Sequence, residues 1–218
     1  MPPPIDSMNR DPSIAHQFED AAQQREAATL GMWIFLSTEI LFFGGMFLGY
    51  TNYRLHHPEA FRLASQHTLL LFGGTNTALL LMSSFTIVLA VRSSELAQPK
   101  IAACWLAVTA GCGVLFLALK SIEYTHEIHE GLLPTANFHL EGVESAPAKM
   151  FFYIYFLMTG VHALHVLIGI VAISIFAIRL RSGRRDLATA VDLLGLYWHF
   201  VDIVWVFLFP LIYLIGRR

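Results

Sequence analysis

The chain has 218 residues, of which 56% are hydrophobic and only 14% are charged, and its formal net charge is −2. Soluble globular domains carry roughly 25% charged residues, so this composition excludes an ordinary soluble domain and indicates a membrane protein. With a net charge this close to zero, nothing in the composition indicates a nucleic-acid partner. Two cysteines, Cys104 and Cys112, stand in an apolar stretch. We interpret them as unreactive core thiols.

The N-terminal residues 1–28 form a polar leader that is rich in proline and acidic residues. The leader lacks an apolar core segment, so it is not a secretory signal peptide. Its last part, from Asp20 to Ala28, is predicted to be a short surface helix. Residues 29–218 are predicted to form one transmembrane domain.

This domain contains five apolar segments long enough to cross a membrane, which takes about 20 residues for a hydrocarbon core of ~30 Å. Backbone polar groups inside lipid must be satisfied within the segment, so each span is predicted to be a helix. The predicted fold class is therefore all-α, a polytopic bundle of five transmembrane helices. The spans are expected near residues 29–50, 68–91, 101–119, 151–178 and 193–215.

The distribution of lysine and arginine predicts the orientation of the bundle. The loop RLRSGRRD, from Arg179 to Asp186, carries four arginines between the fourth and fifth spans, and such loops stay on the cytoplasmic side. The segment from Lys120 to Lys149 is expected to be an acidic loop on the opposite side. The N-terminus is thus predicted inside and the C-terminus outside. Tyrosines near the span ends, including Tyr155 and Tyr213, are interpreted as interface anchors.

A charged side chain in the middle of a span costs roughly 2.5–3.5 kcal/mol on insertion, so each one needs a partner or a function. Glu39 lies in WIFLSTEILFFGG, at the middle of the first span. Its apolar setting favours the uncharged acid. Two interpretations stay open. Glu39 is either a proton-exchanging or lipid-contacting carboxyl group, or a neutral acid that hydrogen-bonds a neighbouring helix.

Two other spans carry polar pairs at helical spacing. His162 and His165 share one face of the fourth span, and His199 and Asp202 share one face of the last span. For the two histidines, interhelical hydrogen bonding is favoured over metal or haem ligation, because no further ligands are identifiable. For His199 and Asp202, a direct contact, a shared partner helix and a proton relay remain the alternatives.

The segment IEYTHEIHEG contains a Glu-x-x-His motif at Glu123 and His126, followed by His129. Di-iron carboxylate bundles use two such motifs with two further glutamates. Because this chain has one, no metal site is predicted, and the segment is interpreted as a solvated helix extension. The sequence also contains no GxxxxGK[ST], GxGxxG, HExxH or CxxCH motif, so neither a nucleotide site nor an attached haem is predicted.

The motifs resemble those of subunit III of the haem–copper respiratory oxidases, the cytochrome c and quinol oxidases, from Gly31 to the C-terminus. STEILFFGGMF is similar to the first shared helix, with its membrane-buried carboxyl at Glu39. LKSIEYTHEI is similar to a helix end with a Glu-Tyr pair, here Glu123 and Tyr124. TGVHALHVLIG resembles the Gly-x-His-x-x-His helix, and GLYWHFVDIVWVFLFPLIYL resembles the terminal Trp-His-Phe-x-Asp-x-x-Trp helix.

This resemblance implies the short, five-helix form found in the plasma (inner) membrane of bacteria. It implies a non-catalytic accessory subunit that carries no haem or copper, since those groups belong to partner subunits I and II. Bound phospholipid, support of proton uptake and protection of the enzyme during turnover are implied as well. Electrons are expected from cytochrome c, with quinol as the alternative, and a respiratory supercomplex is left open. Interhelical polar packing is predicted at His162, His165, His199, Asp202, Glu123 and Tyr124.

Three alternatives remain beside this interpretation. The first is an accessory subunit of a nitric-oxide reductase, whose sequence is similar. The second is a haem-bearing membrane cytochrome that uses His162, His165 and His199. The third is a small transporter with Glu39 as its proton site. A transporter is expected to have interrupted helices at its substrate site, and in this sequence Pro210 interrupts the last span near its end.

Overall fold

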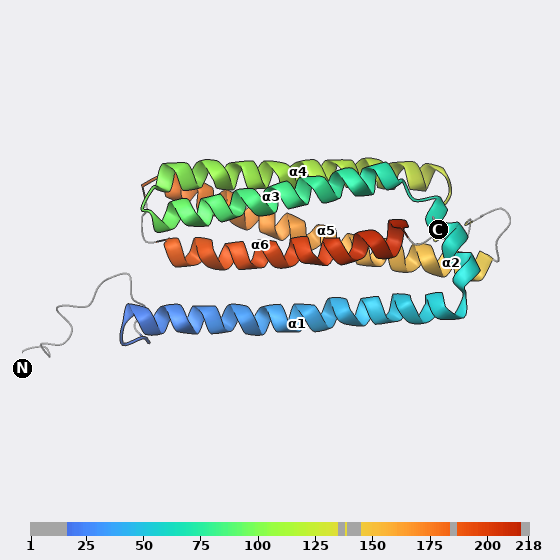
Figure 1. The fold of residues 1–218 in the computed structure, drawn as a ribbon, viewed down its shortest axis with the longest axis horizontal. Coiled ribbons are helices and arrows are strands. Elements are labelled where there is room, and N and C mark those ends of the chain that lie inside the picture. Colours follow the sequence, from blue (N-terminus) through green and yellow to red (C-terminus); the bar gives the residue numbers. More distant parts are fainter. Residues whose placement is uncertain (1–16, 135–137, 139–144, 184–186, 215–218) are drawn as a thin grey trace, which may run out of the picture.

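The computed structural model describes residues 17–134, 138, 145–183 and 187–214, and these residues form helices and short connections with no strand among them. The elements are α1 (Ala21–His56), α2 (Pro58–Gln66), α3 (Leu70–Glu95), α4 (Pro99–His129), α5 (Ser145–Arg181), α6 (Ala188–Phe209) and η2 (Pro210–Leu214). Five helices are long and apolar enough to cross a membrane. This confirms the predicted bundle of five spanning helices (Figure 1).

The first helix is longer than the predicted span. The side chain of Asp20 caps it by accepting a hydrogen bond from the backbone N–H of Gln23 at 2.7 Å. The segment expected to be a separate surface helix is the start of α1, which continues without a break to His56. The helix ends there because the residue before a proline avoids the α conformation, and Pro58 opens α2. Residues 1–16 of the expected leader lie outside the described part.

Helix α4, which contains the third predicted span, differs most from expectation. It continues ten residues beyond the predicted end of that span, residue 119, and stops at His129. Gly131, with a φ of 74°, closes it in the left-handed conformation. The N–H of Leu132 then bonds the carbonyl of Glu127 at 3.0 Å, which satisfies a terminal carbonyl group. The start of the expected acidic loop, from Lys120 onward, is therefore helix that packs inside the bundle.

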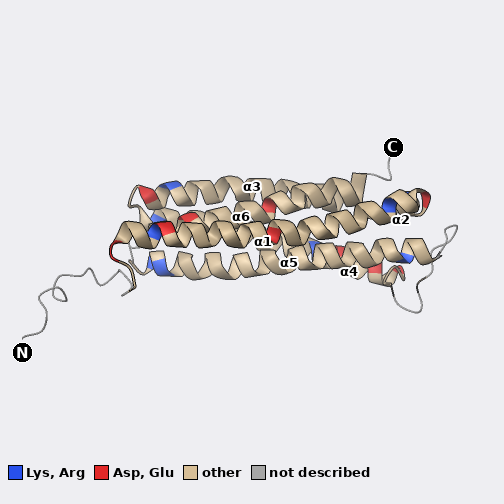
Figure 2. Cartoon of the chain, turned by 90° about the horizontal axis from the view of Figure 1, so that it is seen from below, with Lys and Arg blue, Asp and Glu red and all other residues tan. Residues whose placement is uncertain are grey.

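The helices lie side by side in one long bundle, with α1 at its edge and α6 among the others (Figure 1). In the most apolar stretch of the span formed by α6 and η2, 56% of residues are buried, against 11% in α1. Figure 2 shows that lysine, arginine, aspartate and glutamate gather toward the two ends of the bundle, while its long middle is largely uncharged. This is the distribution that a membrane-spanning bundle requires.

Helix α6 can occupy the centre because small residues let its aromatic side chains approach neighbouring helices. A Cβ atom added at Gly169 would lie 2.8 Å from Cζ3 of Trp198, and one at Gly113 would lie 2.9 Å from its Cη2. At the other end, a Cβ at Gly73 would lie 2.9 Å from the ring of Tyr213. Glycines at these three contacts therefore set the close spacing of α3, α4 and α5 around α6 and η2.

Candidate functional site

The carboxyl group of Glu39 meets an imidazole of another helix. Oε2 of Glu39, on α1, lies 3.1 Å from Nε2 of His165, on α5, and the two side chains are 19% and 14% exposed. The other imidazole nitrogen, Nδ1 of His165, lies 2.8 Å from the carbonyl oxygen of Val161. A carbonyl oxygen only accepts hydrogen bonds, so Nδ1 is the donor there. The Glu39–His165 contact joins α1 to the bundle by a polar link.

An apolar groove lies between α1 and α6, next to this pair. Its volume is about 410 Å³. Phe43 separates the two features, because it lines the groove and also contacts the His165 ring edge-on at 5.2 Å between centroids. The imidazole of His199 also borders the groove, whose remaining lining is apolar. The lining residues are Trp33, Leu36, Ile40, Phe43, Gly44, Phe47, Leu196, His199, Phe200, Ile203, Val204 and Phe207.

The polar residues of α6 turn toward α3 and do not pair with each other. Nδ1 of His199 lies 2.8 Å from the hydroxyl oxygen of Ser84, and the indole N–H of Trp198 donates to the hydroxyl of Ser83 at 2.9 Å. Asp202 is 4% exposed, and neither carboxyl oxygen has a hydrogen-bond partner among the described residues. Ser84 on α3 also acts on the carboxyl group of Asp202. Of the arrangements considered for His199 and Asp202, the structure therefore shows a shared partner helix, with the hydrogen bond made by His199.

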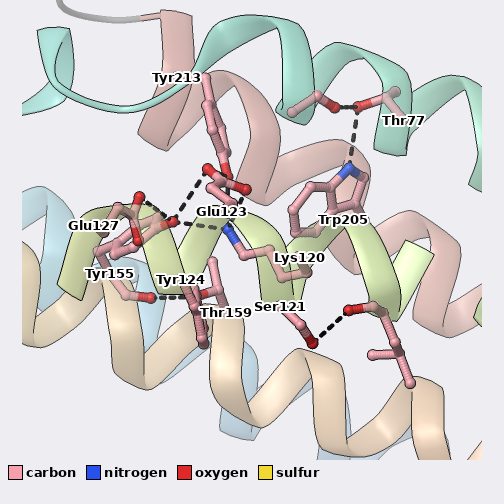
Figure 3. Close-up of polar contacts among 12 residues, drawn as sticks. Thr77, Lys120, Ser121, Glu123, Tyr124, Glu127, Tyr155, Thr159, Trp205 and Tyr213 are labelled. Carbon is pink, nitrogen blue, oxygen red and sulfur yellow. Dashed lines mark hydrogen bonds and ion pairs between the residues drawn. The ribbon is translucent and has the colours of Figure 1, made fainter. Parts of the chain in front are cut away.

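His162 is fully buried and enclosed by aromatic rings. Its ring lies 5.5 Å from that of Phe116 and 5.2 Å from that of Trp205, measured between centroids. Neither imidazole nitrogen has a hydrogen-bond partner within the described part of the chain. The neighbouring indole of Trp205 donates instead to the hydroxyl of Thr77 on α3, at 3.0 Å (Figure 3). His162 thus fills space at the junction of α4, α5 and α6.

A buried polar network joins α4, α5 and η2 (Figure 3). Nζ of Lys120 lies 3.0 Å from Oε2 of Glu123, 2.8 Å from the hydroxyl oxygen of Tyr155 and 2.7 Å from that of Tyr213. The Tyr213 hydroxyl donates to Oε1 of Glu123 at 2.7 Å, and the Tyr155 hydroxyl donates to Oε1 of Glu127 at 2.7 Å. All five side chains are at most 3% exposed. We call this set the Lys120 network.

The Glu-x-x-His motif is divided between the inside and the outside of the bundle. Glu123 is buried in the Lys120 network, whereas the side chain of His126 is 51% exposed and lies 3.6 Å from Glu130. Tyr124 makes a separate contact, because its hydroxyl bonds that of Thr159 on α5 (Figure 3). Within the described residues, no three histidine, cysteine, aspartate or glutamate side chains are grouped as metal ligands.

Four members of the Lys120 network are not predicted from the sequence. The sequence predicts Lys120 and Glu127 in an acidic loop, and Tyr155 and Tyr213 as interface anchors. A signal was present in the spacing, since buried positions of α4 recur every three or four residues and continue through its end. These positions include Leu106, Thr109, Gly113, Phe116, Lys120, Glu123 and Glu127. The buried face of α4 therefore continues past the end of its apolar run, through Lys120, Glu123 and Glu127.

The comparison with known proteins agrees with this architecture. The family of cytochrome c oxidase subunit III matches residues 15–217. A Staphylococcus epidermidis protein named "Probable quinol oxidase subunit 3" is 30% identical over 210 residues, which cover 93% of this chain and 96% of that protein. Proteins of the same name from Staphylococcus saprophyticus and Staphylococcus aureus are each 28% identical, covering 93% and 91% of this chain and 96% and 94% of theirs.

A five-helix membrane bundle with polar contacts between its helices, matched over nearly its whole length, defines an integral subunit of a respiratory complex. The chain belongs to the cytochrome c oxidase subunit III family. It is an accessory subunit III of a haem–copper oxidase, associates with the other subunits of that oxidoreductase, and is a multi-pass protein of the bacterial plasma membrane.

Proposed function

We propose that this subunit supports proton uptake and prolongs turnover of the oxidase while carrying no haem or copper itself. The observation that carries the proposal is the set of contacts made by His162, His165 and His199, the histidines in the motifs that resemble the family. His165 bonds Val161 and Glu39, His199 bonds Ser84, and His162 is enclosed by aromatic rings. His165 and His199 therefore use ring nitrogens for contacts inside the bundle, and His162 is held by ring packing alone among the described residues. The redox centres then belong to subunits I and II.

Glu39 is the polar residue of this subunit that we assign to proton exchange or lipid contact. Its carboxyl group is partly exposed and bonded to His165, so a proton can move within the pair without changing its net charge. The groove between α1 and α6 lies beside it and has the apolar lining that an acyl chain requires. We assign this groove to a membrane phospholipid whose chain packs along Phe43 and Phe47.

We propose the orientation with the N-terminus inside and the C-terminus outside. The start of α1 and the end of η2 lie at opposite ends of the bundle, as an odd number of spans requires (Figure 1). Helix α5 ends at Arg181 and α6 begins at Ala188, both at the end of the bundle where α1 begins, and the arginine-rich sequence from Arg179 to Asp186 covers the end of α5 and the chain that follows it. Since basic loops remain cytoplasmic, that end is the inner one.

The electron donor distinguishes two forms of this proposal. The family description names cytochrome c, and we keep cytochrome c as the first candidate donor. The staphylococcal relatives are named as quinol oxidase subunits, and on that basis a quinol is the second candidate electron donor. The donor binds to other subunits, so identification of those subunits decides between the two.

The experiment is purification of the tagged chain from its native membrane, followed by mass spectrometry of its partners and a visible spectrum before and after separation of the subunits. We expect a haem–copper subunit I among the partners and no haem on the separated chain. Haem that remains on this chain would contradict the proposal. Oxidation of cytochrome c or of quinol by the intact complex identifies the donor.

A further inference from the structure

The hydrogen bonds of the Lys120 network identify which of its groups carry charge. A lysine ammonium group has three hydrogens and no acceptor capacity. Nζ of Lys120 has three oxygen neighbours within 3.0 Å, on Glu123, Tyr155 and Tyr213, so each hydrogen has its own acceptor. This is the coordination of a charged ammonium group. Lys120 therefore brings one positive charge into the bundle.

The carboxyl group of Glu123 has the environment of an ionised acid. Its Oε2 accepts from Lys120 at 3.0 Å, and its Oε1 accepts from Tyr213 at 2.7 Å and lies 3.2 Å from the hydroxyl of Tyr155. Several donors on one carboxyl group favour its charged form, because a protonated oxygen would have to donate to a group that is itself donating. Lys120 and Glu123 thus form a buried ion pair with no net charge.

Glu127, one helical turn further along α4, has a different environment. It is fully buried, its Oε1 accepts a single hydrogen bond from Tyr155, and its Oε2 has no partner among the described residues. The charged groups acting on it are Lys120, already neutralised by Glu123, and the like-charged Glu123 and Glu130. On α2, which packs against α5 and η2, Arg62 is paired at the surface with Glu59 at 3.0 Å.

We infer that the Lys120 network is a proton-binding site, in which Glu127 holds one proton on Oε2 beside the Lys120–Glu123 ion pair. An ionised Glu127 would be a buried charge without a counter-ion, which is far more costly than a neutral acid. The protonated acid still accepts the hydrogen bond of Tyr155 at Oε1, and the Tyr155 hydroxyl in turn accepts from Lys120. The bound proton therefore lies beside the contact that joins α4 to α5 and η2.

The test compares three variants in the intact oxidase complex, Glu127→Gln, Glu123→Gln and Glu130→Gln. An amide imitates a protonated acid in size and hydrogen bonding, so Glu127→Gln is expected to keep the subunit in the complex with an unchanged Tm. Glu123→Gln removes the counter-ion of Lys120 and is expected to lower the Tm. Glu130→Gln changes a surface acid, whose side chain is 45% exposed, and serves as the control.

Infrared spectroscopy gives a second, independent measurement of the proton. The carbonyl stretching band of a protonated carboxylic acid, which shifts in D2O, is expected in the wild-type and Glu130→Gln complexes. The Glu127→Gln complex is expected to lose one component of this band. An unchanged band, or a Glu127→Gln subunit that fails to assemble or loses as much Tm as Glu123→Gln, overturns the inference. It does not rest on the proposed function, because neither measurement involves turnover.

Discussion

The side chains of Glu39 on α1 and His165 on α5 share one hydrogen between Oε2 and Nε2, because Nδ1 of His165 already donates to the carbonyl of Val161. If the imidazole is neutral, the hydrogen belongs to the acid. If the acid is ionised, the hydrogen belongs to the imidazolium. In both cases the pair has no net charge, which explains how a carboxyl group can occupy the middle of a membrane helix.

This relationship predicts the result of substituting Glu39. Glu39→Gln is expected to leave assembly intact, because the amide N–H can donate to Nε2 of His165 as the acid does. Glu39→Leu removes the donor and is expected to loosen α1, which has few other buried contacts. The measurement is the fraction of subunit retained in the purified complex and its Tm. Loss of assembly in Glu39→Gln would refute the shared-hydrogen account.

The contact between His199 and Ser84 predicts a measurable coupling between α6 and α3. Hydrogen bonds between membrane helices contribute about 0.6 kcal/mol on average and about 1.7 kcal/mol at most. We expect a double-mutant cycle of His199→Leu and Ser84→Ala to give a coupling energy in this range, with the spectrum of the separated subunit unchanged. Additive single effects, or a change in a haem absorption band of this chain, would contradict a packing role for His199.

The close approach of Trp198 to two glycines predicts where an added methyl group is not tolerated. Gly169→Ala and Gly113→Ala are each expected to destabilise the bundle by roughly 1–3 kcal/mol, because the indole cannot move away without displacing packed neighbours. Gly111, on the same helix as Gly113, has no heavy atom within 4 Å of an added Cβ. Gly111→Ala is the matched control, with a gain of up to about 1 kcal/mol expected from helix propensity. Thermal unfolding of the purified complex measures all three, and equal effects would refute this packing account.

The sequence predicted the five spanning helices because each is a long apolar run, and hydrophobicity reports that property directly. It predicted helix ends poorly where polar residues are buried. Lys120 looked like the start of a loop, since a lysine after an apolar run normally marks the interface. Its charge is tolerated inside because Glu123, Tyr155 and Tyr213 surround it, and two of these residues come from α5 and η2. Such a contact between distant segments is not readable from local composition.

For the polar residues inside the spans, too, the sequence did not reveal which residue of another helix each one contacts. The sequence placed His162 and His165 on one face of a helix, and helical geometry makes that inference secure. It did not predict that His165 would meet Glu39 while His162 would lie between Phe116 and Trp205. The difference arises from the rotation and spacing of the helices, which depend on Gly113 and Gly169 admitting Trp198. Periodicity gives the face of each helix, and packing selects its partner.

Removal of the whole subunit tests the accessory role. The redox centres are assigned to subunits I and II, so the depleted oxidase is expected to begin turnover at a rate near that of the intact enzyme and then lose activity within fewer turnovers. The physical reason is the loss of a bundle whose weakly packed α1 and adjoining groove leave a large apolar surface for contact with lipid and partner subunits. Progress curves of oxygen consumption measure this loss of activity. Re-addition of the subunit is expected to restore the number of turnovers that the enzyme completes before it loses activity. A depleted complex that never turns over would contradict the accessory role, and one that decays no faster than the intact enzyme would contradict the protective role.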